Sequence, residues 1–394
     1  IQRDLNLEVF DTILSRDYMR GALQRVRDRF GPGAATNGAS GRARPPAERL
    51  QWASKVGPKL VTQVERAKAT IRSDAFFDGP TGFQAFSTLV DALEIASLPY
   101  YPAALHLQSY EAAIPVDSSK ALLKGVSDSA TNIFLDLFRN GIIADIKREQ
   151  PDVVGISIPS MPQMLAAMTL AYLIKEAGLP IHVTVGGPHV SMLREQLAEG
   201  TDVWALIDSA VVFDGEQALL GLVQTLEKGG DLSSVSNLLY RDGETIRVNE
   251  RNTPEKIADL PLPDFDGLPL DRYLAPKLVL PLLTARGCYF GKCAFCNVGY
   301  GEPETFSQLR AEHVAEQMLA LQKRYGAEHI FFSDEAITPR NLRHLSTLMS
   351  DLGTPLQWGG CTRFEKVITR SLLDQMVDGG CRMILYGLES ASEA

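Results

Sequence analysis

The stretch that decides the fold of this chain reads Thr284-Ala-Arg-Gly-Cys288-Tyr-Phe-Gly-Lys-Cys293-Ala-Phe-Cys296. Its three cysteines have the spacing C-x₄-C-x₂-C and follow an apolar run, residues 278–284, that we predict to be a strand. Three thiolates this close repel one another unless they share a soft, positively charged partner. We therefore expect Cys288, Cys293 and Cys296 to ligate a 4Fe–4S cluster whose fourth iron is open to a small molecule.

Structural zinc is the alternative for these thiols. Zinc usually takes four closed protein ligands, often as two separated pairs. No histidine or cysteine occurs in the fifteen positions after Cys296 that could serve as the fourth ligand. The cysteine spacing therefore favours the iron–sulfur cluster over zinc and over incidental thiols.

The chain after the cysteines alternates strand and helix patterns. We predict further strands at residues 329–333, 356–361 and 382–386, each preceded by an amphipathic helix. Four βα units do not close a barrel, so we expect a barrel that is incomplete in this chain after its fourth strand. Five polar residues and one glycine follow these three strands, namely Asp334, Glu335, Arg363, Gly387, Glu389 and Ser390.

A three-cysteine loop after the first strand of a βα barrel, with Phe295 just before the last cysteine, resembles the radical S-adenosylmethionine superfamily. The commonest spacing there is C-x₃-C-x₂-C, and this chain has one residue more, as in a variant found in cobalamin-domain members. The resemblance implies a (βα)₆ barrel, here partial, over residues 275–394. It also implies that S-adenosylmethionine contacts Phe295, Asp334, Glu335, Arg363, Gly387, Glu389 and Ser390.

The resemblance assigns roles as follows. Carboxylates such as Asp334 and Glu335 suit the methionine ammonium, and the guanidinium of Arg363 suits the methionine carboxylate. The reduced cluster then cleaves S-adenosylmethionine, and a 5′-deoxyadenosyl radical abstracts hydrogen from a substrate. Cys361 and Cys381 are expected to be buried strand thiols without a ligand role.

The middle of the chain has the pattern of a doubly wound α/β domain. Apolar runs at residues 153–158, 182–185 and 210–213 alternate with helical segments, and the first run has the composition of a strand buried on both faces. Such a domain before a radical barrel resembles the cobalamin-binding domain, with ligand loops at the carboxyl ends of the strands. The expected cobalamin residues are Ser157, Gly186, Gly187, His189, Asp214, Gly215 and Glu216. The Asp-x-His-x-x-Gly pattern that supplies an axial histidine elsewhere is absent, so His189 is expected to be a loop residue rather than a ligand.

The remaining organisation follows from composition. We predict a helical region over residues 1–98 with a Gly/Ala-rich linker at 31–45, a Rossmann-like domain at 99–250, and a Pro-rich linker at 251–274.

The charge of the chain excludes some partners. Forty-eight acidic against 39 basic residues give a net charge of −9, which disfavours nucleic-acid binding. No apolar run approaches the ~20 residues that cross a bilayer. Five cysteines, none before residue 288, indicate a reducing, cytoplasmic compartment.

Taken together, these patterns predict a cobalamin-dependent radical S-adenosylmethionine enzyme. Its expected reaction is methyl transfer to an unactivated carbon of a small molecule or peptide, with an external electron donor such as flavodoxin or ferredoxin. The alternatives are a radical rearrangement or oxidation without methyl transfer, and, in another class, a non-catalytic iron–sulfur electron carrier or zinc-stabilised protein.

Overall fold

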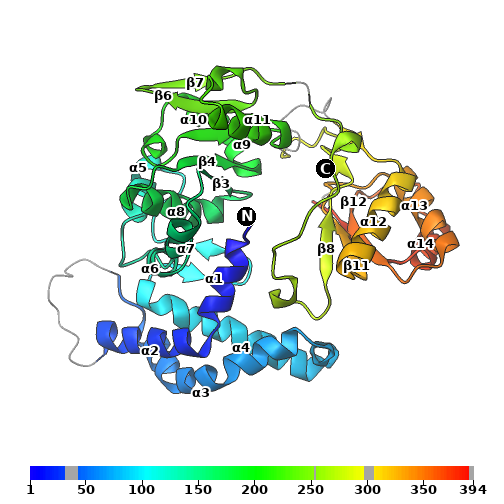
Figure 1. Cartoon of the computed structure of the whole chain (residues 1–394). Coiled ribbons are helices and arrows are strands. Elements are labelled where there is room, and N and C mark those ends of the chain that lie inside the picture. The colour runs from blue at the N-terminus through cyan, green and yellow to red at the C-terminus, as the bar shows by residue number, and fades with distance from the viewer. Residues whose placement is uncertain (32–42, 253, 297–305, 390–394) are drawn as a thin grey trace. The chain divides into compact units, whose positions relative to one another are not determined.

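The computed structural model describes residues 1–31, 43–252, 254–296 and 306–389 (Figure 1). The chain divides into two compact units. One comprises Asp4–Thr253, and the other comprises Pro254–Ala394 together with Ile1–Arg3. The finer division into four segments stays a prediction, and most of the expected linker at 31–45 lies outside the described residues.

The first unit begins with four long helices. They are α1 (Leu5–Ile13), α2 (Arg16–Phe30), α3 (Ala47–Ile71) and α4 (Gly79–Ser97). Helices α1, α2 and α4 each begin at a side-chain N-cap. Asp4, Ser15 and Asp78 each accept a hydrogen bond from a backbone N–H in the first turn. The helical expectation for this region is thus confirmed, and single 3₁₀ turns lie at Asp74–Phe77 and Leu98–Tyr100.

A five-stranded sheet with the order β3-β4-β5-β6-β7 forms the rest of this unit. Its parallel strands are β3 (Val153–Ser157), β4 (His182–Gly186) and β5 (Ser209–Val211), and its antiparallel strands are β6 (Leu238–Asp242) and β7 (Thr245–Val248). The accompanying helices are α5 (Ser119–Gly125), α6 (Phe134–Asn140), α7 (Ile142–Glu149), α8 (Met164–Glu176), α9 (Pro188–Met192), α10 (Arg194–Ala198) and α11 (Glu216–Glu227). A small ladder joins β1 (Ala104–Leu105) to β2 (Tyr110–Glu111), and 3₁₀ turns occur at Met161–Gln163, Asp202–Ala205 and Leu232–Ser234.

The structure corrects one expectation for this sheet and adds two details. Strand β3 is an edge strand with Gly155 and Ser157 exposed, so it is not buried on both faces. Helix α11 buries Ala218 and Leu222, whereas Leu219 and Val223, which repeat at the same spacing, stay exposed. The β6–β7 hairpin was missed, although its two-residue turn begins at Gly243, whose φ of 62° is typical of such turns.

The second unit contains a four-stranded parallel sheet with the order β13-β12-β11-β8. Its strands are β8 (Val279–Leu282), β11 (His329–Phe332), β12 (Gln357–Thr362) and β13 (Cys381–Tyr386), and its helices are α12 (Ala311–Tyr325), α13 (Pro339–Leu352) and α14 (Arg370–Asp378). The expected partial barrel with four strands is therefore confirmed. Single 3₁₀ turns, Ile257–Asp259 and Leu270–Arg272, lie in the proline-rich stretch before it.

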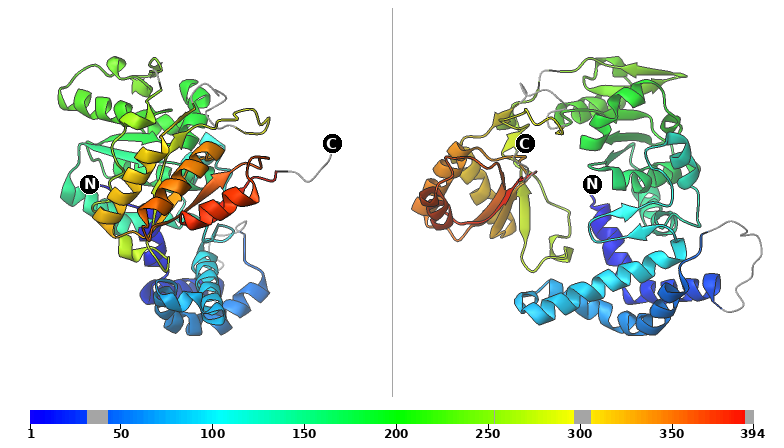
Figure 2. Two further views of the ribbon diagram at one scale, coloured as in Figure 1. Left: turned by 90° about the vertical axis from the view of Figure 1, so that its right-hand side faces the viewer. Right: turned by 180° about the vertical axis from the view of Figure 1, so that it is seen from behind.

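The three helices cover one face of this sheet (Figures 1 and 2). Leu280, Phe332 and Trp358 point into the core beneath them, and the indole of Trp358 donates a 2.8 Å hydrogen bond to Gly379 O. The alternate residues face the other way, and Met383 and Leu385 are about half exposed. Cys381 belongs to the core, as expected, whereas Cys361 lies on the opposite face and is only half-buried.

None of the helices in the described part of the chain has the length and apolarity that a bilayer crossing requires.

Candidate functional site

The cysteine loop leaves the sheet of the second unit at the carboxyl end of β8. Directly after β8, the short strand β9 (Ala285–Arg286) pairs antiparallel with β10 (Ser307–Gln308). This ladder closes the base of the loop that carries Cys288, Cys293 and Cys296. Cys288 and Cys293 are half-buried, Cys296 is exposed, and none of the five cysteines is in a disulfide.

Asp334 connects the base of the cysteine loop to the end of β11 through hydrogen bonds. It follows β11 and is only 3% exposed. Its carboxylate accepts hydrogen bonds from the backbone N–H groups of Thr284, at 2.6 Å, and Ala285, at 3.0 Å, and from the Thr284 hydroxyl. Burial raises the pKa of Asp334 above its ordinary value, against the lowering effect of these donors. The structure thus gives Asp334 a structural role, and its predicted contact with S-adenosylmethionine stays untested.

Asn341 holds the far side of the same base. Its side-chain amide donates to Leu309 O at 2.9 Å, and its amide oxygen accepts from Gln308 at 3.3 Å. It lies in the first turn of α13, which Thr338 caps. Sequence reasoning missed this residue, because a polar side chain in a first helical turn has no distinctive local pattern.

A second set of contacts joins the loop to the residues after β12. The Tyr289 hydroxyl donates to Glu365 Oε1 at 2.6 Å, and the Arg363 guanidinium lies 3.5 Å from the centre of the Phe290 ring. An Nη1 atom of Arg363 is 3.7 Å from Glu365 Oε1. Arg363, which the resemblance assigned to the methionine carboxylate, therefore lies beside the cysteine loop. Tyr289, Phe290 and Glu365 were not expected to contribute.

The other residues expected to bind S-adenosylmethionine are exposed. Glu335 points to solvent at the end of β11, unlike its neighbour Asp334. Phe295 is 67% exposed. Gly387 and Glu389 follow β13, and a Cβ on Gly387 would come within 2.5 Å of Glu389 Oε1. Ser390 lies outside the described residues. The ends of β8, β11, β12 and β13 all meet at one edge, because the four strands run parallel.

The donor set fits an iron–sulfur cluster in its chemistry, since three thiols that form no disulfide lie on one short loop at this edge. Within the described ranges, no three His, Cys, Asp or Glu side chains are arranged to hold a metal ion. Cluster ligation by Cys288, Cys293 and Cys296 accordingly stays a prediction.

The predicted cobalamin loops of the first unit lie at the carboxyl ends of neighbouring strands. Gly187, after β4, has a φ of 104°, and a Cβ there would lie 2.9 Å from Ile158 O. Ile158 N donates to Gly186 O at 2.7 Å, and His189 N donates to Ile158 O at 3.2 Å. These contacts bring the segment after Ser157 and the Gly186–Gly187 loop together. Burial lowers the pKa of His189, which favours its neutral ring.

The third loop joins the second through Ser191. The Phe213 N–H donates to Ser191 Oγ at 2.8 Å, and Asn237 Nδ2 donates to the backbone oxygen of Asp214 at 3.1 Å. Phe213 has a φ of 63°, and the Arg251 guanidinium lies 4.0 Å from its ring centre. The segment Asp214, Gly215 and Glu216 then leads into α11. Ser191 and Phe213 are structural supports that the sequence pattern did not reveal.

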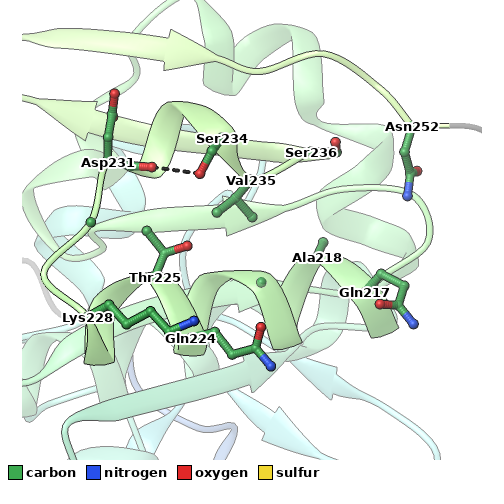
Figure 3. Close-up of a pocket in the computed structure, with 12 residues that line it drawn as sticks. Gln217, Ala218, Gln224, Thr225, Lys228, Asp231, Ser234, Val235, Ser236 and Asn252 are labelled. Carbon is green, nitrogen blue, oxygen red and sulfur yellow. Dashed lines mark hydrogen bonds between the residues drawn. The ribbon is translucent and has the colours of Figure 1, made fainter.

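A polar groove runs along α11, beyond these loops (Figure 3). Gln217, Gln224 and Lys228 line it from the helix, and Ser234 and Asn252 line it from the facing segments. It includes none of the residues predicted to bind cobalamin, so we do not assign the groove to that site.

Comparison with known proteins relates part of the first unit to a domain family. Residues 108–223 match the B12-binding domain family, within the predicted 99–250 segment. The chain is similar in fold to the solved structure of the cobalamin-dependent S-adenosylmethionine radical enzyme OxsB with aqua-cobalamin and S-adenosylmethionine bound. The TM-score is 0.53 and the identity 22%, over 64% of this chain and 37% of that one.

A second solved structure is the radical S-adenosylmethionine methyltransferase TsrM from Kitasatospora setae, with tryptophan substrate and a SAM analog bound. The TM-score is 0.52 and the identity 15%, over 71% of this chain and 57% of that one. The predicted resemblance to cobalamin-dependent radical S-adenosylmethionine enzymes is thus confirmed. At these identities, the two likenesses establish the fold.

Two curated relatives are similar in sequence. An uncharacterized methyltransferase of Pyrococcus horikoshii is 30% identical over 262 residues, which are 65% of this chain and 56% of the relative. The 4′-phospho-dehydrooxetanocin synthase of Priestia megaterium is 28% identical over 206 residues, which are 50% of this chain and 26% of that protein. The chain therefore spans only part of the length of both relatives.

Proposed function

We propose that this chain provides the cobalamin-binding and cluster-binding parts of a radical S-adenosylmethionine enzyme that transfers a methyl group to an unactivated carbon. The observation that carries the proposal is the three-cysteine loop at the carboxyl edge of a parallel sheet, in a chain that also carries a B12-binding domain. The relative named as a methyltransferase supports the reaction class.

When bound, a 4Fe–4S cluster supplies the electron that cleaves the sulfonium of S-adenosylmethionine, and cobalamin supplies a methyl carrier. Cys288, Cys293 and Cys296 would hold the cluster. The exposed carboxylate of Glu335 suits the methionine ammonium, since Asp334 is committed to Thr284 and Ala285. Phe295, Gly387, Glu389 and Ser390 would contact the rest of S-adenosylmethionine.

The three loops around Gly187 would support cobalamin. Ser157, Gly186 and His189 lie on segments that hydrogen bonds already join, and Asp214, Gly215 and Glu216 begin the adjoining helix. The substrate would be a small molecule or peptide, and a flavodoxin or ferredoxin would deliver the electron. We place the enzyme in the reducing cytoplasm, where free cysteines and an oxygen-sensitive cluster persist.

A second candidate reaction is a radical rearrangement or oxidation without methyl transfer. The relative from Priestia megaterium favours it, because that protein is named a synthase and not a methyltransferase. The same residues would bind the same cofactors in both reactions, so the products distinguish them.

The test is anaerobic reconstitution of the full chain with iron, sulfide and cobalamin, followed by reduction and incubation with S-adenosylmethionine. We expect cluster absorbance, retained cobalamin and 5′-deoxyadenosine. Cys293→Ala should abolish the cluster absorbance, and Cys381→Ala, a core cysteine of the same unit, should retain it. A fully loaded cluster that yields no 5′-deoxyadenosine would contradict the radical proposal.

Product analysis decides between the two reactions. Methyl transfer yields S-adenosylhomocysteine beside 5′-deoxyadenosine, whereas a rearrangement yields 5′-deoxyadenosine alone. If the chain binds zinc in place of iron, the alternative of a non-catalytic, zinc-stabilised protein would be favoured. A cluster that is reduced and reoxidised without binding S-adenosylmethionine would favour the electron carrier.

A further inference from the structure

Four side chains connect the first half of the cysteine loop to the segment after β12. They are Tyr289, Phe290, Arg363 and Glu365, which we call the loop clasp. The Tyr289 hydroxyl is 2.6 Å from Glu365 Oε1, and the Phe290 ring lies under the Arg363 guanidinium at 3.5 Å. Arg363 Nη1 is 3.7 Å from Glu365 Oε1, which links the two contacts into one set.

These contacts differ in strength from ordinary surface contacts. All four side chains are half-buried, so water screens their charges less than at an open surface. The hydrogen bond from a phenol to a carboxylate is charge-assisted and is roughly twice as strong as a neutral one. A guanidinium over an aromatic face gains further when it is partly desolvated. The four side chains of the loop clasp therefore interact more strongly than fully exposed side chains of the same types would.

Tyr289 also reaches the other end of the loop. Its ring packs edge-on against Phe306, just before β10, with the ring centres 6.1 Å apart. One side chain thus touches the start of the loop, the end of the loop and the segment after β12. Its phenol joins residues 76 positions apart in the chain.

The three cysteines of the motif differ in exposure. Cys288 directly precedes the clasped aromatic residues. Cys288 and Cys293 are half-buried, whereas Cys296 and its neighbour Phe295 are exposed. Gly291, with a φ of 58°, turns the chain between Cys288 and Cys293. The clasp consequently holds the two residues that directly follow Cys288 near the sheet edge.

We propose that Tyr289 and Glu365 are positioning residues that hold Cys288 at the sheet edge before a cluster binds. The inference rests on the proposed function for its purpose, because a preset thiol lowers the conformational cost of assembling the cluster. Arg363 is held in turn by Phe290 and Glu365, so the clasp also presets the side chain assigned to the methionine carboxylate.

The first experiment measures amide hydrogen exchange in the apo protein, without iron. Tyr289→Phe keeps the ring but removes the hydroxyl, and Glu365→Ala removes the acceptor. We expect each variant to exchange about tenfold faster over residues 287–291, with α12 unchanged as a sign that the fold is intact. Glu365→Gln, which retains an amide oxygen as acceptor, should restore part of the protection.

The matched control is Tyr325→Phe. Tyr325 also donates its hydroxyl to a carboxylate of the same unit, Asp264, at 3.0 Å, but it lies outside the loop. This variant should leave exchange over residues 287–291 at the wild-type rate. The double variant Tyr289→Phe/Glu365→Ala should exchange no faster than Glu365→Ala alone, because Glu365→Ala already removes the hydrogen bond that Tyr289→Phe removes.

The second experiment follows iron uptake, at limiting iron and sulfide, through the absorbance of the forming cluster. Tyr289→Phe and Glu365→Ala should take up iron several-fold more slowly than Tyr325→Phe. Wild-type exchange rates at residues 287–291 in both clasp variants would overturn the proposal. An equal loss of hydrogen-exchange protection in α12 would also overturn the proposal, because it would show that the two residues stabilise the whole unit. Failure of the wild-type chain to bind any cluster would refute the proposed function, while the exchange result would still decide the clasp.

Discussion

At the scale of single residues, the adjacent carboxylates Asp334 and Glu335 have different surroundings. Asp334 turns inward and accepts three hydrogen bonds from Thr284 and Ala285, and Glu335 stays exposed at the sheet edge. A pair of acids after a strand gives no local indication of which one turns inward. The pattern correctly located the acidic pair at the edge, and only the fold separated the two roles.

Replacing Asp334 with alanine should destabilise the second unit. The change leaves two buried backbone N–H groups and a hydroxyl without their acceptor, so we expect a loss of about 3 kcal/mol in the free energy of unfolding. Urea denaturation followed by Trp358 fluorescence, in a Trp52→Phe/Trp204→Phe background, would measure it. Glu335→Ala is the control and should change stability by less than ~0.5 kcal/mol. Equal losses in the two variants would contradict the role of Asp334.

The buried carboxyl group also predicts a pH dependence. Burial raises the pKa of Asp334 above its ordinary value of 3.8, so the folded state binds its proton more tightly than the unfolded state. The contribution of Asp334 to the free energy of unfolding should therefore fall as the pH rises from about 4 through the raised pKa. Above that pKa the contribution should level off. Asp334→Asn removes the titration. Urea denaturation of both proteins across this range should show the slope in the wild-type chain only, and parallel curves would contradict the prediction.

The five cysteines should differ in reactivity in the apo protein. Cys381 is buried, which raises its pKa to about 11, and burial beside Glu335 and Asp334 also raises the pKa of Cys361. Because the thiolate is the reactive form, iodoacetamide at pH 8 should modify Cys288, Cys293 and Cys296 first and Cys381 last. Mass spectrometry of timed digests would give the order. Early modification of Cys381 would show that β13 is not packed as described.

At the scale of elements, the loops at the sheet edges depend on close backbone approaches. Gly187 combines a φ of 104° with a backbone neighbour, Ile158, that a Cβ would meet at 2.9 Å. The resemblance to the cobalamin-binding domain assigns both Gly186 and Gly187 to a cobalamin loop. The structure shows that Gly187 is first required for packing one loop against the next.

Gly187→Ala should therefore cost about 3 kcal/mol of stability, from backbone strain and from the contact with Ile158. Gly178→Ala is a matched control, since Gly178 also has a positive φ, 64°, but nothing lies within 4 Å of an added Cβ. That variant should cost only ~1 kcal/mol. Thermal unfolding followed by circular dichroism would compare the two. Equal effects would mean that the approach to Ile158 does not constrain position 187.

At the scale of the whole molecule, periodicity predicted most elements near their observed bounds, including all four strands of the second unit. It failed where the neighbours of an element matter. Leu219 and Val223 have the same helical spacing as Ala218 and Leu222, and only the fold decides that α11 buries the second pair. The apolar composition of β3 indicated a central strand, yet β3 lies at the edge of its sheet.

The sequence by itself determined the order of the elements, the thiol motif after a strand and the resemblance that followed from it. These are local properties, because a hydrophobic period or a cysteine spacing is contained within a few consecutive residues. Only the tertiary structure decided that Asp334 turns inward, that Gly187 packs on Ile158, and that Tyr289 reaches Glu365. Those contacts join residues far apart in the chain, and their geometry exists only once the strands that carry them lie side by side.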